Sequence, residues 1–487
     1  DARWNAIPVS VRPYAWLDLS MPREFDYEKF LEGDVREALP TPVRRVDFEA
    51  ERSLFYQALE RAQKKNIPLL LQMNTGRFLE KYGLNTGTAD EMAEYSDLFK
   101  HFPCIAGIHT AETASFLPIS ANVSSHIKNF TALARKYNRK FVWTAFMAKR
   151  ICLWNNLMTD STWVSFMKEN SNTIIPIWKN VEPHDNMLNW ADCVGLWLSG
   201  HSGGWGIKFD SWYYSNLLAV KSGARREQYY PSLGKNVMNM TLYACPPYLL
   251  KDGMILSALT GSSYFSTEAM GAYDYATDGP LRSVLDKTYQ FIVANQLWRS
   301  KNEVLALCKV ALESPVQSEV LAKGFSHSFT KQSNSPNIVW NQVFGIADNG
   351  LDFIPNEGKN FIVPVVPKQD NAKKLFPLIL KPEKITTGNA LSAALASNYP
   401  RRFVASDANV LVFDAGKYVY ITDSRETNRT DLEFSLESSS SDDYNFLYLM
   451  PDATCLTNIK PTKELSSQAW KVKILLPVGC SILMIKK

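Results

Sequence analysis

The chain has 487 residues, a mass of 55.1 kDa and a formal net charge of +4 at neutral pH. Because single hydrophobic cores usually stop growing at about 250–300 residues, this length predicts two folding units. The charge excess is too small and too scattered to favour binding of nucleic acid or of an anionic membrane surface. No apolar run approaches the ~18 residues of a membrane span, and the first residues lack the order of a signal peptide.

Cysteine and histidine spacing argues against a metal site. The seven cysteines are widely spaced without a Cys-x-x-Cys pair, and the six histidines never stand four residues apart. We therefore expect mostly buried, unpaired thiols rather than a disulfide framework. The sequence also has no P-loop and no dinucleotide fingerprint, so we expect an activity that uses no metal and no cofactor.

Over roughly the first 270 residues, short apolar and β-branched runs alternate with segments of helical period, which is typical of a parallel α/β fold. Eight such runs fit the strand number of a (β/α)8 barrel, with a doubly wound sheet as the structural alternative. The predicted strands are Val9–Leu17, Pro68–Met73, Ile105–Thr110, Phe141–Phe146, Thr173–Trp178, Val194–Leu198, Val237–Ala244 and Ser262–Thr267.

Two segments between the strands carry clear helical signals. Apolar residues repeat at helical spacing over Asp47–Lys65, behind an aspartate suited to the cap position. Later, Gly279-Pro280 opens a segment in which Leu281, Leu285, Thr288 and Ile292 share one face. We predict a helix in each place and take the second as the last helix of the barrel.

After about residue 330 the apolar pattern changes to a period of two, broken by turn residues. Val410–Phe413 and Tyr418–Thr422 predict a hairpin around the turn that ends at Gly416. Further strands are predicted at Tyr444–Met450, Trp470–Leu476 and Ser481–Ile485. The predicted domains are therefore a (β/α)8 barrel over residues 1–330 and an antiparallel, β-sandwich-like domain over residues 331–487.

Three carboxylates stand at the ends of predicted barrel strands or of runs that lead out of them: Glu112, Asp210 and Glu268. Barrel enzymes place their reacting groups on the loops after the strands, so the fold would bring these distant residues together. A pair of carboxylates is the minimum for cleaving a glycosidic bond, because one protonates the leaving oxygen while the other drives attack. Taken singly, each acid is equally well explained by capping or ion pairing.

Aromatic residues gather around the glycine-rich segment that precedes Asp210. Sugar faces stack on such rings, and histidines can bind sugar hydroxyl groups, although a core position accounts equally well for many of these residues. The predicted substrate-binding residues are Trp197, His201, Trp205, Trp212, Tyr213, Tyr243 and His109.

The tryptophan-rich segment resembles glycoside hydrolase family 98. The distinctive pieces are Gly195–Gly200, which leads into Trp205-Gly206, and Asp210-Ser211-Trp212. The resemblance covers most of residues 1–330. Further pieces that stand in the order and approximate spacing of that family are Pro68–Met73, Ile108–Glu112, Phe141–Thr144 and Ser266–Glu268.

This resemblance implies an endo-acting, inverting glycosidase built as a (β/α)8 barrel packed against a β-sandwich-like domain. It makes Glu112 the general acid, and Asp210 with Glu268 the residues that hold and deprotonate the attacking water. Well-known members cut the internal β-1,4-galactosyl linkage of blood-group A and B glycans, which is the substrate we favour. Another branch is an endo-β-1,4-xylanase type that acts on decorated (glucurono)arabinoxylan, and this is the alternative.

We expect an oligosaccharide or polysaccharide as the partner, a monomer, and a secreted or cell-surface location in a bacterium. The competing class is a non-catalytic carbohydrate-binding protein, in which the same aromatic residues bind glycan and the carboxylates only accept hydrogen bonds. A third possibility is a structural barrel whose acids form buried ion pairs with Arg77, Lys149 or Arg150.

Overall fold

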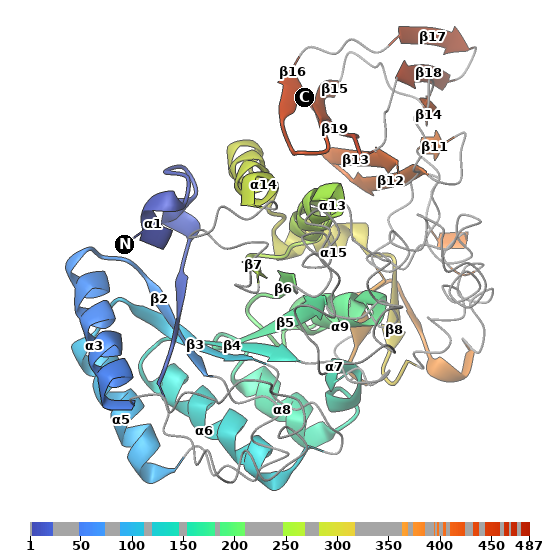
Figure 1. Ribbon diagram of the computed structural model, residues 1–487. Coiled ribbons are helices and arrows are strands. Elements are labelled where there is room, and N and C mark those ends of the chain that lie inside the picture. The colour runs from blue at the N-terminus through green and yellow to red at the C-terminus, as the bar shows by residue number, and fades with distance from the viewer. Residues whose placement is uncertain are drawn as a thin grey trace, which may run out of the picture.

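The computed structural model of the chain shows a parallel α/β unit followed by antiparallel β-sheets (Figure 1). Its described residues are 2–22, 48–73, 88–111, 119–145, 153–180, 186–209, 247–267, 282–316, 363–368, 374–384, 394, 397–398, 403–405, 410–423, 432–437, 444–457, 462–466, 469–474 and 479–487.

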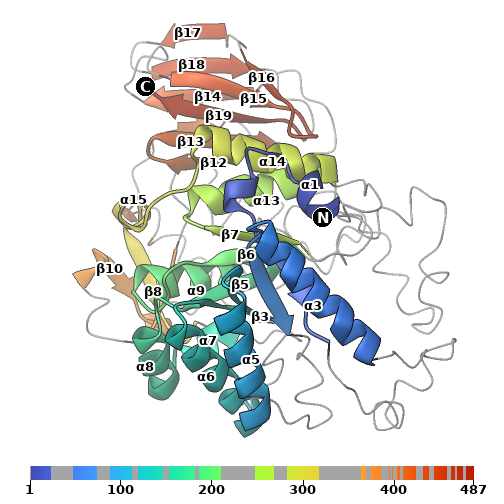
Figure 2. The same cartoon turned by 90° about the vertical axis from the view of Figure 1, so that its left-hand side faces the viewer.

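A parallel sheet of seven strands, in the order β1 to β7, curls into a half-barrel whose outside is covered by helices (Figures 1 and 2). The rings of Trp16 and Tyr264, beside the first strand and on the last, have centroids 5.4 Å apart, so the two edges of the curl approach each other. The predicted fold class is confirmed. The strands are β1 (Leu17–Ser20), β2 (Leu69–Met73), β3 (Ile105–Ala111), β4 (Lys140–Ala145), β5 (Ile174–Asn180), β6 (Gly206–Phe209) and β7 (Tyr264–Thr267).

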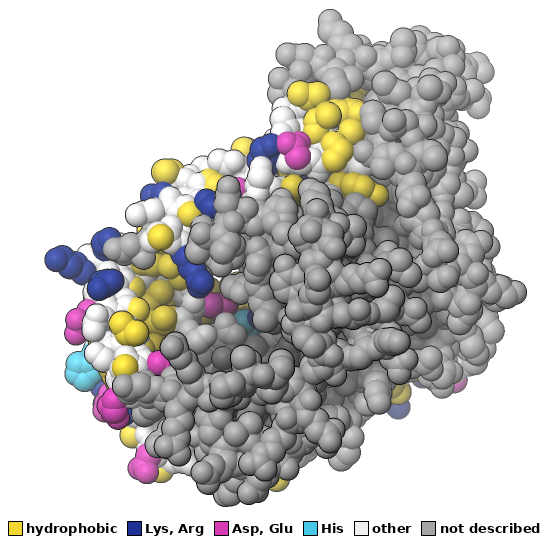
Figure 3. Space-filling view, viewed as in Figure 1, with side chains coloured by type: hydrophobic (Ala, Val, Ile, Leu, Met, Phe, Trp, Pro, Cys, Tyr) yellow, Lys and Arg dark blue, Asp and Glu magenta, His cyan; other side chains and the backbone are white. Residues whose placement is uncertain are grey.

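The amphipathic helices on the outside of the curl bury their apolar faces and leave charged residues at the surface, where side chains of both signs are visible along the edge in Figure 3. Among the described residues, no helix combines the length and apolar character needed to cross a membrane. The helical segments are α1 (Ala2–Ala6), η1 (Arg12–Tyr14), α3 (Phe48–Lys64), α5 (Ala89–His101), α6 (Ala121–Lys136), α7 (Leu153–Leu157), α8 (Ser161–Glu169), α9 (Asn186–Leu198), α13 (Pro247–Leu259), α14 (Arg282–Asn295), α15 (Lys301–Leu307) and η5 (Pro382–Lys384).

Both predicted helices are confirmed, as α3 and α14. In α14 the predicted face is buried at Leu285, Thr288 and Ile292. Several helix starts carry a side-chain cap that satisfies a free backbone N–H group. Thr88 caps α5 by accepting from the backbone of Glu91, for example.

Two predicted strands are wrong, and a third, Val237–Ala244, lies outside the described residues. Val194–Leu198 ends helix α9, which is buried on several sides and so shows a continuous apolar run like that of a buried strand. Val9–Leu17 contains the short helix η1, and the strand begins only at Leu17, because prolines 8 and 13 favour turns over a ladder.

A small parallel sheet packs on the outer side of α9. Its order is β10 (Leu378–Leu380), β8 (Val310–Glu313) and β9 (Val365–Val366). A Cβ atom on Gly195 of α9 would lie 1.7 Å from the carbonyl oxygen of Val365, so only glycine lets the helix approach β9 this closely. This sheet joins a strand before residue 330 to strands after it, and the domain boundary at that residue stays a prediction.

Two antiparallel sheets follow, which confirms the predicted C-terminal β architecture. The predicted hairpin is formed by β12 and β13, with Gly416 in its turn at a φ of 76°. One sheet has the order β11 (Phe403–Ala405), β14 (Leu432–Glu437), β18 (Ala469–Ile474) and β17 (Thr462–Ser466). The other has the order β12 (Val410–Ala415), β13 (Tyr418–Asp423), β19 (Ser481–Lys486), β15 (Tyr444–Leu449) and β16 (Cys455–Thr457).

The second of these sheets is anchored on α13 and α14, which lie between it and the parallel sheet in both views (Figures 1 and 2). The fully buried Lys251 of α13 donates to the carbonyl oxygens of Met450 and Gly479, at 3.3 and 2.7 Å. Its neighbour Asp252 accepts from Tyr420 and, at 2.9 Å, from Thr422.

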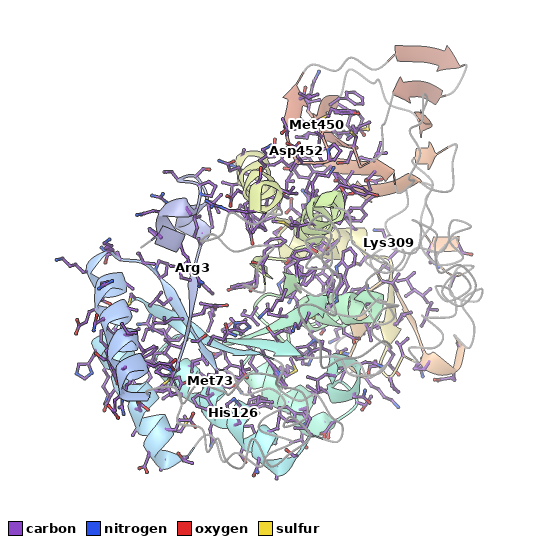
Figure 4. All side chains as sticks on the ribbon, in the orientation of Figure 1. Arg3, Met73, His126, Lys309, Met450 and Asp452 are labelled. Carbon is purple, nitrogen blue, oxygen red and sulfur yellow. The ribbon has the colours of Figure 1, made fainter. Side chains whose placement is uncertain are left out.

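On the α14 side of the same junction, Lys287 contacts Asp452, which Figure 4 labels next to Met450. The Nζ atom of Lys251 lies 3.5 Å from the Asp252 carboxylate, so a buried ion pair forms the centre of the junction. Every charge in this pair is compensated by a partner, which is the condition for burying charges.

Replacing Lys251 with methionine should leave the Asp252 carboxylate buried without its cation. Removing one partner of a buried pair costs about 3–5 kcal/mol, to be measured as the free energy of unfolding in urea. The double variant Lys251→Met/Asp252→Leu should recover part of this loss. If Lys251→Met is no more destabilised than the exposed control Lys168→Met on α8, the junction does not depend on the ion pair.

Candidate active site

The concave side of the curled sheet is built in two layers. Side chains alternate along a strand, so one set faces the helices and the other set faces the interior of the curl. The interior set begins with an apolar layer in which Leu70, Val142, Ile175 and Ile177 form a cluster separate from the main core. Trp16 and Tyr264 pack against this cluster from the two edges of the sheet.

Polar residues form the next layer toward the carboxyl ends of the strands. In five of the strands, the residue two positions beyond a member of this apolar layer is polar or charged, and in β3 and β6 such a residue stands two positions beyond a glycine, Gly107 or Gly206. The carboxyl ends of parallel strands meet at one face, where barrel enzymes place their active sites. The residues of this polar layer are Asp18, Gln72, His109, Thr144, Lys179, Lys208 and Ser266.

Three members of the polar layer form a hydrogen-bonded chain across the sheet. The Nδ1 atom of His109, on β3, lies 3.2 Å from Oδ2 of Asp18 on β1. The Nε2 atom of the same ring lies 2.8 Å from the hydroxyl oxygen of Thr144 on β4. An ionised carboxylate only accepts hydrogen bonds, so Nδ1–H donates to Asp18. The His109 side chain is buried, whereas that of Asp18 is 30% exposed.

Asp18 is held in its charged form. Burial by itself would raise the pKa of the Asp18 carboxyl, but the charge and hydrogen bond of His109 and the charge of Lys208 outweigh this and lower it. The site therefore presents an ionised carboxylate at neutral pH.

Two lysines lie side by side in the same layer. Lys179 on β5 and Lys208 on β6 are partners in the register of these strands, and both are buried. Buried lysines are rare without charged or polar partners. Two of them at the carboxyl end of the sheet make this end a candidate functional site.

The three predicted catalytic acids, Glu112, Asp210 and Glu268, lie outside the described residues. In the sequence they directly follow the last residues of β3, β6 and β7. The assignments of general acid and base therefore stay predictions. Three of the predicted substrate-binding residues also lie outside the described ranges: Trp212, Tyr213 and Tyr243.

The predicted sugar contacts Trp197, His201 and Trp205 are interior residues in the structure. All three are buried, and they come before β6 in the chain, whereas Asp210 comes after it. The residues before a parallel strand lie at the opposite end of the sheet from those after it, so these side chains belong to the amino end. The ring of Trp197 lies so close to Gly261 that a Cβ atom there would be 2.3 Å from it, which is core packing.

His109 lies at the carboxyl end as predicted, but both ring nitrogens contact protein groups and its side chain is buried. The buried His109 ring therefore holds the Asp18 carboxylate in place through its Nδ1 atom. The sequence interpretation missed Asp18, Thr144, Lys179 and Lys208. The sequence signal for them was a polar residue near the carboxyl end of a mostly apolar strand. Each stands at a position that shares its face of the sheet with the residue two positions earlier.

Comparison with known proteins identifies similar chains. A family model described as glycosyl hydrolase family 98 matches residues 1–296. Three crystal structures of the catalytic module of a family 98 glycoside hydrolase from Streptococcus pneumoniae TIGR4 have a similar fold: the native form, a complex with the H-disaccharide blood group antigen and a complex with the LewisY pentasaccharide blood group antigen.

Each of these structures is 15% identical to this chain, and the match covers 99% of this chain and 94% of the other. The TM-scores are 0.61 for the native and H-disaccharide structures and 0.62 for the LewisY structure. A search of curated protein sequences finds no match. At this identity the structures support the fold, and the family model supports the family.

The lowered pKa of Asp18 predicts how acid affects the fold. A carboxyl group with a lowered pKa stabilises the native state above its unfolded value of about 3.9, and this contribution is lost as the pH falls through the native value. Replacing His109 with leucine should therefore cost about 1.5–3 kcal/mol of unfolding free energy at pH 6, and the difference from wild type should narrow below about pH 4.

Urea unfolding between pH 3 and pH 7 measures this difference. Thr144→Val is the matched control, because it removes the second hydrogen bond of the His109 ring but leaves the carboxylate contact in place. Its cost should stay nearly constant across this range. A His109→Leu cost that does not change with pH would contradict the role given to the Asp18 pair.

Proposed function

The chain belongs to glycosyl hydrolase family 98, and from that premise we propose that it is an endo-acting, inverting enzyme that cleaves an internal β-1,4-glycosidic bond. As a member of this family it is a glycoside hydrolase. The bond we propose is the β-galactosyl linkage of blood-group A and B type glycans. This choice is supported by the similar crystal structures, two of which hold blood group antigens.

The observation that carries the proposal is the polar layer at the carboxyl end of the sheet. Glu112, Asp210 and Glu268 follow three of the strands that form this layer. Asp210 and Glu268 stand two residues beyond Lys208 and Ser266 in the sequence, and an extended chain at these positions would turn them to the same side, whereas Glu112 is assigned to this mouth because it follows the end of β3. We expect all three acids at one mouth of the half-barrel.

In this proposal, Glu112 protonates the glycosidic oxygen as the bond breaks, while Asp210 and Glu268 hold a water molecule and remove its proton. Inversion needs the acid and the base about 6.5–9.5 Å apart, so that the water fits between the base and the sugar. Glu112 must be protonated and the base ionised at the start of each cycle. The ammonium groups of Lys179 and Lys208 favour the ionised form of nearby carboxylates, because an opposite charge lowers a carboxyl pKa.

Stacking of the sugar rings is assigned in this proposal to Trp212, Tyr213 and Tyr243. The tryptophans before β6 belong to the core at the other end of the sheet, so they are not available for this purpose. Aromatic rings at the mouth would bind the apolar C–H faces of the substrate, leaving its hydroxyl groups to the polar layer.

Replacing Glu112 with glutamine should lower kcat by about 100- to 10,000-fold, because an amide cannot donate the proton that the leaving oxygen needs. Binding of the oligosaccharide should remain measurable by calorimetry. The control is Glu169→Gln, which changes an exposed carboxylate at the end of α8 and should leave kcat unchanged. Near-normal turnover by Glu112→Gln would remove the acid assignment.

The choice of substrate and stereochemistry is tested by product analysis. Digestion of blood-group A glycan and of arabinoxylan in parallel, followed by mass spectrometry, should give defined fragments from the blood-group glycan. Proton NMR during the first minutes should show the α-anomer at the new reducing end, because a β-linkage is cleaved with inversion. Fragments from arabinoxylan alone would favour the xylanase, the β-anomer would exclude inversion, and no fragments from any glycan would favour a non-catalytic binding protein.

A further inference from the structure

We propose that Asp18 is a substrate-binding residue, whose carboxylate accepts hydrogen bonds from hydroxyl groups of the sugar that occupies the bottom of the site. The inference deepens the proposed function and rests on it. In this proposal the β1 edge of the half-barrel binds the sugar, and the three acids Glu112, Asp210 and Glu268 cleave the glycosidic bond.

Asp18 is the accessible charged group of the polar layer. Its side chain is 30% exposed, whereas those of His109, Lys179 and Lys208 are buried. A ligand that enters from the carboxyl end therefore reaches the Asp18 carboxylate before it reaches the buried side chains of His109, Lys179 and Lys208.

The carboxylate has a fixed orientation and a spare acceptor. His109 contacts Oδ2 at 3.2 Å, and within the described part of the chain no hydrogen bond is formed by Oδ1. Thr144 contacts the far nitrogen of the same ring, so the imidazole is held from both sides. A carboxylate that is positioned in this way binds hydroxyl donors without first losing its own rotational freedom, which favours affinity.

The surroundings of Asp18 suit a sugar ring. The half-buried rings of Trp16 and Tyr264 lie one step below it, at the closing edge of the sheet, and provide an apolar floor. Aromatic surface combined with a fixed acceptor matches a sugar ring, which has an apolar C–H face and a rim of hydroxyl donors.

His109 acts in this proposal as a positioning residue. It does not contact the sugar, but its Nδ1–H group fixes the plane of the carboxylate. The amide nitrogen of asparagine lies close to the place of the histidine Nδ1 atom, so His109→Asn retains a donor. His109→Leu retains none.

The experiment measures binding in the Glu112→Gln background, where turnover does not interfere. Calorimetry with a blood-group A oligosaccharide, and in parallel with an arabinoxylan oligosaccharide, first establishes which glycan binds the parent. Asp18→Ala should then weaken that binding by about 10- to 100-fold, and Asp18→Asn by less, because the amide retains one acceptor oxygen. Asp97→Asn, an exposed carboxylate on α5, is the control and should leave the affinity unchanged.

Analogues of the bound glycan that lack one hydroxyl group identify the contact. Removing the hydroxyl that Asp18 binds should weaken binding to the parent by about tenfold or more, but should have little effect on the Asp18→Ala variant. His109→Asn should retain more affinity than His109→Leu. If Asp18→Ala does not fold, as judged by circular dichroism, the same comparison is made with Asp18→Asn.

The outcomes separate the two proposals. If neither glycan binds the parent, the proposed function fails, and with it the inference that rests on it. If a glycan binds the parent and the Asp18 variants bind it within twofold of the parent, the proposed function stands and the role of Asp18 is overturned. Equal losses for every analogue in the parent and in the Asp18→Ala variant would also overturn it.

Discussion

The register of the parallel sheet is the constraint on which the rest of the structure depends. Side chains alternate along each strand, so a slip of one residue would turn the polar layer outward against the helices and bring their apolar partners inward. The main core fixes the register, because Leu71, Ile108 and Phe141 are fully buried on the outer face. The same ladder therefore builds the core and assembles the polar layer, which places the site at one end of the sheet.

Polar and charged groups in the interior are tolerated because they compensate one another. Asp18, His109 and Thr144 form one network from three strands, and Lys251 and Asp252 form another beneath the C-terminal sheet. Such networks are stable when their members are satisfied, and they restrict the conformations of the side chains involved. In the first network the restricted group faces the opening of the half-barrel. In the second network, Lys251 and Asp252 join helix α13 to the C-terminal sheet.

The sequence contained enough information for the fold class and for several elements. The amphipathic period predicted α3 and α14, and the alternating period with its glycine turn predicted the hairpin of β12 and β13. It failed at Val194–Leu198, because a helix covered by β5 on one side and β9 on the other has the continuous apolar pattern of a buried strand.

The candidate site was harder to predict because its contacts join distant residues. Asp18 and His109 are 91 positions apart, and only the curl of the sheet brings their atoms together. Trp197, His201 and Trp205 are close to Asp210 in sequence, yet a strand separates them from it, so proximity in the chain was a misleading guide. A residue reaches the site only if it lies at the carboxyl end of its strand. Predicting the site from the sequence therefore requires the exact strand boundaries.

The central claim is that the carboxyl end of the sheet binds and cleaves a glycan. The most direct test is a crystal structure of the Glu112→Gln variant with its bound oligosaccharide. The account predicts a sugar over Asp18, with residue 112 on one side of the scissile bond and Asp210 and Glu268 on the other, separated from it by about 6.5–9.5 Å. A sugar bound at the amino end of the sheet, or three acids too far apart to share one bond, would contradict it.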